Sequence, residues 1–219
     1  MQFLYETQAG KSEIFIVGEN YRYLFKVRRF AEGQILYVRN LQDEFLYRYK
    51  INSIGKKDAK MELIDFSKNK KESKFFHLIW CMIDTKIVEK TLPMLNQLGV
   101  SKISFVYCER SQKNFKLDMK RVEKILINSS QQCGRDNLMQ LEIFKDLQQL
   151  LERYSDIYVL DFGGKKEWSD LSRVLVGCEG GFSENERKQL QKYNKIGLNN
   201  DLILKSETAT VAIASKLLI

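Results

Sequence analysis

The sequence has few of the residues that metal sites and disulfide frameworks require. It contains one histidine, His77, and four cysteines, none of which forms a C-x-x-C pair: Cys81, Cys108, Cys133 and Cys178. With so few ligands, a zinc site has almost no support and we expect no metal. The setting of His77 within FFHLIWCMI favours a structural histidine over a catalytic one. We expect free thiols and a reducing compartment.

Long hydrophobic runs and nucleotide-binding glycine motifs are also missing. No apolar run reaches the roughly 18 residues that a membrane helix requires. The first ten residues, MQFLYETQAG, lack the basic and apolar regions of a secretory signal. Neither G-x-G-x-x-G nor G-x-x-x-x-G-K-[ST] occurs, which removes the main support for a dinucleotide-binding Rossmann site or a P-loop. We therefore expect a cytoplasmic protein without a membrane partner.

The chain does have charge and enough apolar residues for a core. Hydrophobic residues make up 44% of the 219 residues and charged residues 29%, with a single proline, which is typical of folded chains of one or two domains. The formal net charge is +8, and residues 1–74, with 15 Lys and Arg against 10 Asp and Glu, carry +5 of it. A basic chain attracts polyanions such as RNA. Charge that keeps the protein in solution explains the same balance about equally well.

The first third of the chain has the pattern of a small β-rich domain. Short segments rich in Ile, Val, Phe and Tyr predict strands at 13–17, 34–39, 44–51 and 60–65. Turn residues lie beside them, at Gly18, Gly33, Asn40 and Gly55. Closely spaced strands of this kind predict a small barrel, which we place at residues 1–66. The polar stretch SKNKKESK, residues 67–74, is predicted to be a linker.

From residue 75 onward, predicted strands and helices alternate. The continuous apolar run FFHLIWCMI predicts a strand that is buried on both faces. Further strands are predicted at 102–107, 156–161, 173–176 and 202–204, and helices at 85–97, 117–133, 144–154, 184–193 and 207–218. In the helix at 117–133, the side chains expected to face inward are Met119, Val122, Ile125, Leu126 and Ser129. The alternation predicts an α/β domain with a mainly parallel sheet over residues 75–219.

One glycine-rich segment has the pattern of a cofactor-binding loop. In VLVGCEGGFSENE, a β-branched strand runs into GCEGG at 177–181, and Ser183 with Glu186 forms the pattern of a capping box. Glycines let backbone N–H groups approach a ligand closely, and a helix start offers free N–H groups. The segment therefore indicates a cofactor cradle. A tight turn that requires glycines for their positive φ is the structural alternative.

A second segment, LILKSETATVAIASKLL at 202–218, joins a short apolar stretch to the last predicted helix. Ser206 is the expected N-cap, and Glu207 with Thr208 falls in the first turn, where an acidic group suits the helix dipole. The alanines and valines of this helix allow close packing against a neighbour. Taken alone, the segment is explained as well by ordinary helix capping.

Together the two segments resemble the RsmE family, the 16S ribosomal RNA uracil-N3 methyltransferases of the SPOUT superfamily. The family pattern is G-P-E-G-G-[FL]-S-x-x-E followed by I-L-R-T-E-T-A, and this chain has GCEGGFSENE and ILKSETA in that order. The stretches KVRRFAEGQ (26–34), QLGVSKISFVYCERS (97–111) and SSQQCGR (129–135) are similar to other family segments. The chain departs from the pattern at Cys178, Lys205, Gln131 and Met94, where the family has proline, arginine, an acid and lysine.

The resemblance implies a fold and partners that composition does not show. It implies an N-terminal small PUA-like β-barrel that binds RNA, and a C-terminal SPOUT α/β domain with a deep trefoil knot, a rare exception to unknotted chains. It implies S-adenosyl-L-methionine as the cofactor and 16S ribosomal RNA, or the small ribosomal subunit, as the partner. It also implies a homodimer in which the pocket abuts the partner subunit.

The resemblance also suggests which residues form the site. Those expected to bind the cofactor are Asp161, Phe162, Gly163, Gly177, Cys178, Glu179, Gly180, Gly181, Leu198, Leu204, Lys205, Glu207 and Thr208. Those expected to contact RNA are Arg22, Lys26, Arg28, Arg29, Arg110, Ser111 and Arg135. Arg135, as a cationic partner of the uracil or its phosphate, and Glu179 are the catalytic candidates. For Arg135 the alternative is a surface salt bridge, and for Glu179 it is a structural role. For the basic residues of the barrel, the alternative is a solvated surface.

Two other functions fit the same sequence. One is a different SPOUT methyltransferase that modifies a 2′-hydroxyl or another base, and mapping the methyl group separates it from a uracil-N3 enzyme. The other is a non-catalytic RNA-binding protein that kept the fold, which the changes at Cys178, Lys205 and Gln131 would suit. Such a protein need not bind the cofactor, so cofactor affinity distinguishes it.

Overall fold

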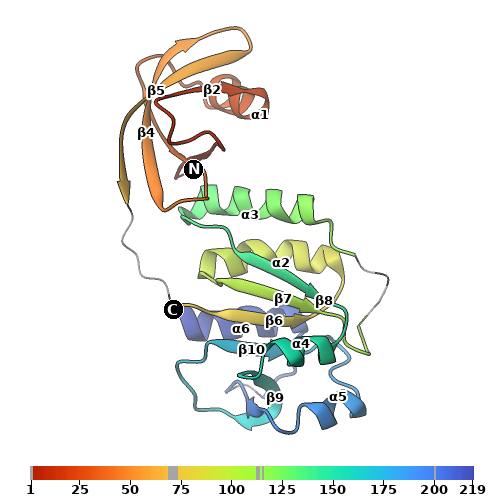
Figure 1. The fold of residues 1–219 in the computed structure, drawn as a ribbon. Helices are drawn as coiled ribbons and strands as arrows, with labels where there is room; N and C mark the ends of the chain where they lie inside the picture. Colours follow the sequence, from red (N-terminus) through yellow and green to blue (C-terminus); the bar gives the residue numbers. More distant parts are fainter. Residues whose placement is uncertain (1, 69–73, 112–113, 115, 200) are drawn as a thin grey trace. The chain divides into compact units, whose positions relative to one another are not determined.

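The chain divides into two compact units. The computed structural model describes residues 2–68, 74–111, 114, 116–199 and 201–219 (Figure 1). The first unit comprises Met1–Glu72 with Ile127–Leu138, and the second comprises Ser73–Leu126 with Met139–Ile219. Of the predicted linker at 67–74, residues 69–73 lie outside the described residues.

The first unit is built on a five-stranded sheet with the order β1-β3-β4-β5-β2. Its strands are β1 (Leu4–Tyr5), β2 (Glu13–Val17), β3 (Ile35–Arg39), β4 (Phe45–Ile54) and β5 (Asp58–Lys68). The pairs β2–β5, β3–β4 and β4–β5 are antiparallel, and β1–β3 is parallel. All four strands predicted for this region are present. The last of them, β5, continues to Lys68, past the predicted end of the barrel at residue 66.

Alternating burial gives this small sheet its core. Along β2, Ile14 and Ile16 are fully buried while Phe15 between them is exposed, as the two-residue period of a strand requires. A buried tyrosine adds a polar anchor. The hydroxyl of Tyr49 donates to the carbonyl of Lys11 (2.6 Å) and accepts from the backbone N–H of Gly10 (2.9 Å), so the chain before β2 is tied to β4.

A helical segment that was not predicted from the sequence follows β2. It consists of α1 (Gly18–Tyr21) and a π-helical turn, η1 (Arg22–Val27). Tyr21, Leu24 and Phe25 are buried in the core of the unit, and their spacing of i, i+3 and i+4 is that of an amphipathic helix. The four basic residues expected to bind RNA in this region are exposed on or just after η1: Arg22, Lys26, Arg28 and Arg29.

The second unit contains a six-stranded sheet in which every pair is parallel, with the order β11-β9-β10-β6-β7-β8. The strands are β6 (His77–Cys81), β7 (Lys102–Val106), β8 (Gln140–Phe144), β9 (Tyr158–Lys165), β10 (Arg173–Val176) and β11 (Asn194–Ile196). The predicted parallel α/β sheet is therefore confirmed, but β8 and β11 were missed. The predicted strand at 202–204 is wrong, because this segment is irregular and pairs with no strand of the sheet.

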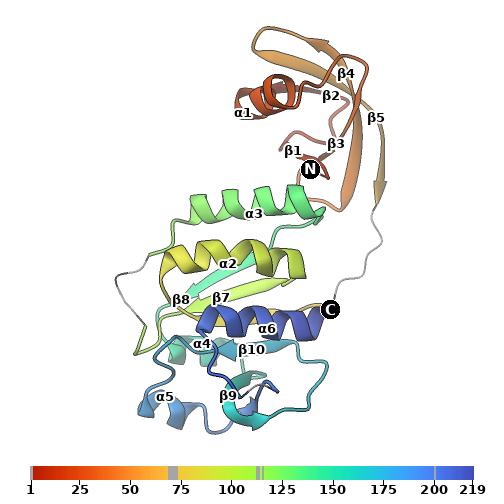
Figure 2. The ribbon, with the colours of Figure 1, turned by 180° about the vertical axis from the view of Figure 1, so that it is seen from behind.

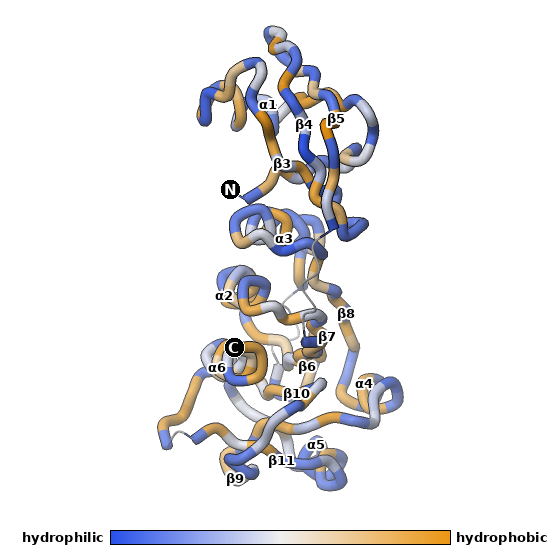
Figure 3. The backbone as a smooth tube through the Cα atoms, turned by 90° about the vertical axis from the view of Figure 1, so that its left-hand side faces the viewer, coloured by the Kyte–Doolittle hydropathy of each residue, from blue (hydrophilic) through white to orange (hydrophobic). Residues whose placement is uncertain are grey.

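Helices cover both faces of this sheet. The helices that belong wholly to this unit are α2 (Thr85–Leu98), α4 (Leu147–Arg153), α5 (Glu184–Gln189) and α6 (Ser206–Leu218). A further helix, α3 (Met119–Cys133), begins in this unit, and its residues from Ile127 onward belong to the first. Seen edge-on, α2 and α6 lie on one side of the sheet and α4 on the other (Figure 3), and the view from behind shows α2 and α6 side by side (Figure 2). In α3, Val122 and Leu126 are buried as expected, whereas Met119 is 41% exposed, so its inward placement was wrong. The structure offers no helix, over the residues it describes, with the length and apolar character to cross a membrane.

The central strand β6 is buried along its whole length, as its apolar sequence predicts. It carries the indole of Trp80, which is fully buried and lies 6.0 Å from the ring of Phe105 on β7, between centroids. The indole N–H donates to the hydroxyl of Ser206 at the start of α6 (2.8 Å). A buried Trp N–H requires such a partner, so the core itself fixes where α6 begins.

The cysteines depart from the expectation of four free thiols. Cys81 at the end of β6 and Cys108 just after β7 form a disulfide, with their Cα atoms 5.9 Å apart. These strands are parallel neighbours, so their carboxyl ends bring the two residues together. Cys133 and Cys178 are free. The expectation is therefore wrong for one pair.

The single histidine is structural, as predicted. The ring of His77 is buried, with Nδ1 accepting from Nε of Arg173 (2.9 Å) and Nε2 paired with the hydroxyl of Ser104 (2.7 Å). The Ser104 hydroxyl in turn donates to Glu142 (3.1 Å). Because Nδ1 is an acceptor, the neutral ring carries its proton on Nε2. Burial and the charges of Arg173 and Lys102 lower the pKa of His77 to about 3, so the ring stays neutral at ordinary pH.

Two backbone segments pass each other closely near the edge of this sheet. A Cβ atom added to Gly164 in β9 would overlap the backbone of Ile196 in β11. A Cβ atom added to the next residue, Gly197, would lie 2.9 Å from the carbonyl oxygen of Gly164. Because glycine has no Cβ atom, the two backbones approach each other at Gly164 and Gly197 more closely than any other residue would allow.

We expect Gly164→Ala to lower the free energy of unfolding by about 2 kcal/mol or more, because the methyl group forces the two backbones apart. Gly163→Ala is the matched control, since a Cβ atom on the neighbouring residue meets nothing within 4 Å. Urea denaturation of both variants and the parent chain measures the difference. Equal stability of the two variants would show that the close approach is not a constraint.

Candidate functional site

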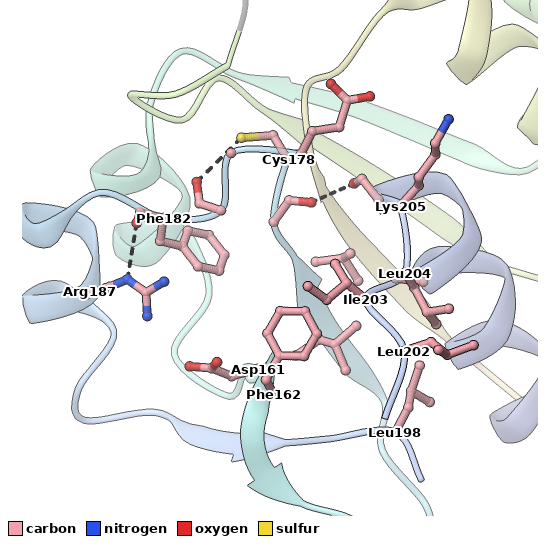
Figure 4. A pocket seen from close by; sticks show the side chains of 18 residues that line it. Asp161, Phe162, Cys178, Phe182, Arg187, Leu198, Leu202, Ile203, Leu204 and Lys205 are labelled. Atoms are coloured by element: carbon pink, nitrogen blue, oxygen red, sulfur yellow. Dashed lines mark hydrogen bonds between the residues drawn. The ribbon is translucent and has the colours of Figure 1, made fainter. Parts of the chain in front are cut away.

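A pocket in the second unit is formed by three chain segments that are far apart in sequence (Figure 4). It has a volume of about 420 Å³ and is lined by Leu160–Phe162, Val176–Phe182 and Leu202–Ser206, together with Arg187, Leu198 and Ala209. This volume lies within the range of about 300–1,000 Å³ that is common for small-molecule sites. The loop after β10 is one wall, as expected where ligands bind at the carboxyl ends of parallel strands.

The glycine-rich loop forms a tight turn that ends in a capped helix. The N–H of Gly181, whose φ is +65°, donates to the carbonyl of Cys178 (2.9 Å). The Ser183 hydroxyl then accepts from the N–H of Glu186 (3.2 Å), and the Glu186 carboxylate accepts from the N–H of Ser183 (2.9 Å). The predicted capping box is confirmed, and the loop needs a glycine at its last position.

The turn after β7 is attached to this loop from the side. Glu186 is only 2% exposed, and its second oxygen accepts from the N–H of Glu109 (2.8 Å). The guanidinium of Arg110 donates to the carbonyl of Gly180 (2.7 Å). A buried carboxylate with both oxygens bonded is well stabilised, so the two loops are held as one assembly.

The third wall is held by the hydroxyl of Ser206. This hydroxyl accepts from the indole of Trp80 and donates to the carbonyl of Gly177 (2.5 Å). The expectation that Ser206 is the N-cap of α6 is not met, because Ser206 is the first helical residue and Lys205 occupies the N-cap position without a side-chain bond. The hydroxyl instead joins the start of α6 to the glycine-rich loop.

Most of the residues expected to bind a cofactor line the pocket. These are Asp161, Phe162, Gly177, Cys178, Glu179, Gly180, Gly181, Leu198, Leu204 and Lys205. Gly163, Glu207 and Thr208 are not among its lining residues. Thr208 is exposed, and Glu207 has a buried carboxylate oxygen with no hydrogen-bond partner in the described part of the chain.

Several lining residues were not predicted from the sequence. They are Leu160, Val176, Phe182, Arg187, Leu202, Ile203, Ser206 and Ala209. The apolar pair Leu202 and Ile203 was assigned to a strand, but the two side chains are 72% and 85% exposed. Nothing in the sequence indicated that Arg187 lines the pocket, because the sequence does not show which face of the short helix α5 borders the loop.

Cys178, which replaces the family's proline, is compatible with the loop geometry. Its side chain is buried, and its thiol lies 3.5 Å from the carbonyl of Gly181 as a hydrogen-bond donor. Burial raises the pKa of the Cys178 thiol. The side chain is therefore a neutral wall of the pocket, not a reactive thiolate.

The residues expected to contact RNA differ in their accessibility. Ser111 is buried, and its hydroxyl accepts from the N–H of Cys108 (3.2 Å), so the structure does not present it to an RNA ligand and that expectation is corrected. Arg110 is turned toward the glycine-rich loop. Arg135, in the first unit, donates from Nε to the backbone and side-chain oxygens of Asn137 (3.0 Å each), and burial lowers the pKa of its guanidinium. Within the described residues, no group of three or more His, Cys, Asp or Glu side chains is placed to hold a metal ion.

Comparison with known proteins also finds two domains, but it includes residues 127–138 in the second. A family model described as an RNA methyltransferase domain matches residues 70–218, and one described as an RNA methyltransferase PUA domain matches residues 16–64. The ribosomal RNA small subunit methyltransferase E of Helicobacter pylori (strain J99) is 42% identical, with 98% of each chain covered. The protein of the same name from Aquifex aeolicus is 26% identical, again with 98% of each chain covered.

Solved structures share the fold across nearly the whole chain. The ribosomal RNA small subunit methyltransferase E of Neisseria gonorrhoeae, bound to S-adenosyl methionine, aligns with a TM-score of 0.83 at 19% identity, covering 99% of this chain and 96% of its own. A putative methyltransferase from Legionella pneumophila, in complex with the same cofactor, aligns with a TM-score of 0.81 at 23% identity, covering 98% and 94%. The N-terminal sheet domain is thus PUA-like, and the C-terminal domain is an α/β RNA methyltransferase domain with a parallel sheet. Because a family model matches more than half of the chain and a 42% identical relative covers nearly all of it, the chain belongs to the ribosomal RNA small subunit methyltransferase E family.

Proposed function

We propose that the protein transfers a methyl group from S-adenosyl-L-methionine to N3 of a uracil in 16S ribosomal RNA. The observation that carries this proposal is the pocket in which the glycine-rich loop, the segment at Asp161 and the lead-in to α6 meet. Family membership supports the reaction class and the RNA substrate. The resemblance of GCEGGFSENE and ILKSETA to the uracil-N3 enzymes supports the methylated atom.

The residues of the pocket fit this cofactor. Its walls at Leu160, Val176 and Ile203 are apolar and suit an adenine ring, whereas Asp161 and Glu179 supply carboxylates that suit a cationic ligand. The glycines of the loop leave its backbone open to close approach. A cavity of about 420 Å³ has room for a nucleoside with an amino-acid tail.

The chain's own contribution to the reaction is positioning and electrostatics. S-adenosylmethionine, when bound, would supply an electrophilic methyl group for N3, with its sulfonium sulfur as the leaving group and a base or water as the acceptor of the N3 proton. The Ser206 and Glu186 hydrogen bonds hold the pocket walls in place, and fixed geometry of this kind lowers a barrier by limiting the loss of entropy. Cationic donors to the uracil carbonyl oxygens favour the N3 anion.

Named residues are assigned roles on this basis. We assign Arg135 to the uracil or its phosphate, and Glu179 to the orientation of the loop or contact with the substrate. Arg110, beside the loop, is assigned to RNA. The exposed cluster of Arg22, Lys26, Arg28 and Arg29 provides phosphate contacts. In this scheme residues 1–66 bind RNA, 67–74 link the domains and 75–219 catalyse methyl transfer, in the cytoplasm, where ribosomal RNA is found.

We also propose that the chain threads through itself as a trefoil knot at the pocket. The close backbone approach of Gly164 to Ile196 supports this arrangement, because it brings β9 against the strand that leads into the third pocket wall. The hydroxyl of Ser206 then holds the returning chain against Gly177. A knotted pocket would keep its walls together without a bound ligand.

A homodimer is proposed with α2 and α6 at the interface. The two helices lie side by side (Figure 2), and Met94 on α2 is 45% exposed. A partner subunit would supply apolar cover for this side chain. We expect sedimentation at the mass of two chains, and a monomer at micromolar concentration would contradict the interface.

Ribosomal RNA from cells with and without the gene provides the direct test of the reaction. We expect one 3-methyluridine in 16S RNA to disappear when the gene is deleted and to return when the purified protein and cofactor are added. Mass spectrometry of nuclease digests identifies the methylated atom. A missing 2′-O-methyl group, or a methyl group on another base, would identify a different RNA methyltransferase. Lack of cofactor binding would identify a non-catalytic RNA-binding protein.

Arg135→Ala should lower kcat/KM on RNA about 10-fold or more, because a charge-assisted contact to the substrate is lost. The affinity for the cofactor, measured by calorimetry, should change less than about twofold. Arg153→Ala, which removes an exposed arginine from α4, is the control and should match the parent enzyme. If Arg135→Ala weakened cofactor binding instead, the residue would belong to the cofactor site.

A further inference from the structure

We propose that Arg187 and Asp161 form a recognition pair for the zwitterionic amino-acid tail of the cofactor, with Arg187 binding the α-carboxylate and Asp161 the α-ammonium group. This inference rests on the proposed function, because it assigns one end of the same pocket. The amino-acid tail is present both in S-adenosylmethionine and in S-adenosylhomocysteine, the product of methyl transfer. Arg187 was not among the residues that the sequence suggested.

Arg187 is a cation held in place at the pocket wall. Its Nε atom donates to the carbonyl of Phe182 (3.2 Å), which fixes the plane of the guanidinium. Over the described part of the chain, its two terminal nitrogens have no hydrogen-bond or ion-pair partner. A guanidinium anchored through Nε presents both terminal N–H groups as a fork, the geometry that binds a carboxylate through two bonds.

Asp161 supplies the complementary charge on the same side of the pocket. Figure 4 shows its carboxylate and the guanidinium of Arg187 on that side, below and beside the ring of Phe182. Its carboxylate forms an ion pair with Lys195, at 3.6 Å, and its side chain is 27% exposed. This leaves the carboxylate able to accept from a ligand ammonium group. A zwitterion requires such a pair, because a single charge would leave the other end of the tail without a partner.

The opposite side of the pocket is apolar, which fixes the direction of the ligand. Leu198, Leu202 and Leu204 lie across from Arg187 in Figure 4. The other lining cation, Lys205, points its ammonium group away from the cavity in the same view. An adenosine group therefore suits the leucine side and a charged tail suits the arginine side. The pocket is divided in the same way as the molecule that it is proposed to bind.

Two ligands that differ only in the tail test the pair. S-adenosylhomocysteine carries the amino-acid tail, 5′-methylthioadenosine replaces it with a methyl group, and neither has a sulfonium charge. By calorimetry on the full chain, we expect Arg187→Ala to weaken the affinity for S-adenosylhomocysteine about 10-fold or more. The affinity for 5′-methylthioadenosine should change less than about twofold. Asp161→Asn should show the same selectivity, and Arg187→Lys should recover part of the loss because it keeps the charge.

Lys188→Ala is the matched control. It removes a neighbouring cation from the same helix, α5, but Lys188 does not line the pocket, so both affinities should match those of the parent chain. Equal weakening of both ligands by Arg187→Ala would assign Arg187 to loop structure and overturn the pair. If Arg187→Ala left both ligand affinities unchanged and weakened RNA binding, Arg187 would be assigned to an RNA phosphate. This result would also overturn the pair. If the parent chain bound neither ligand, the proposed function itself would fail.

Discussion

The pocket depends on one buried hydroxyl. Ser206 accepts from the indole of Trp80 in the sheet core and donates to the carbonyl of Gly177 in the glycine-rich loop. Without it, two buried groups would lose their partner, which costs about 1–3 kcal/mol for each. The bond also explains why the lead-in to α6 can remain irregular. Its ends are held by β11 and by Ser206, and Leu202 and Ile203 line the cavity instead of joining a strand.

Local patterns of the sequence predicted much of this arrangement. The strands β2 and β10 were predicted with their observed ends, and the capping box of Ser183 and Glu186 is present as expected. These features depend on neighbours within a few residues, so the sequence carries their signal directly. The two chain segments expected to meet did meet in one cavity. That expectation came from the family resemblance, because no local pattern states which loops are neighbours in space.

The errors concern features that depend on tertiary contacts. The strands β8 and β11 were missed, since pairing with β7 and β9 forms them more than their own composition does. Ser111 looked like a surface residue after a strand, but its hydroxyl caps the turn beginning at Cys108. The Cys81–Cys108 disulfide required knowing that β6 and β7 are parallel neighbours. To predict that Arg187 lines the pocket, it is necessary to know which face of α5 borders the pocket.

Three of the departures from the family pattern, at Cys178, Lys205 and Gln131, are accommodated in this structure, and this favours an enzyme over a protein that has kept only the fold. Cys178 fills its position in the glycine-rich loop and donates to Gly181. Lys205 lines the pocket and keeps the positive charge of the family's arginine, with its ammonium group pointing away from the cavity (Figure 4). Gln131 accepts from the N–H of Tyr5 (2.8 Å) through its side-chain oxygen, a bond that the family's carboxylate could equally form. A chain that had lost selection for cofactor binding would not be expected to retain a 420 Å³ pocket with an anchored arginine and a facing carboxylate.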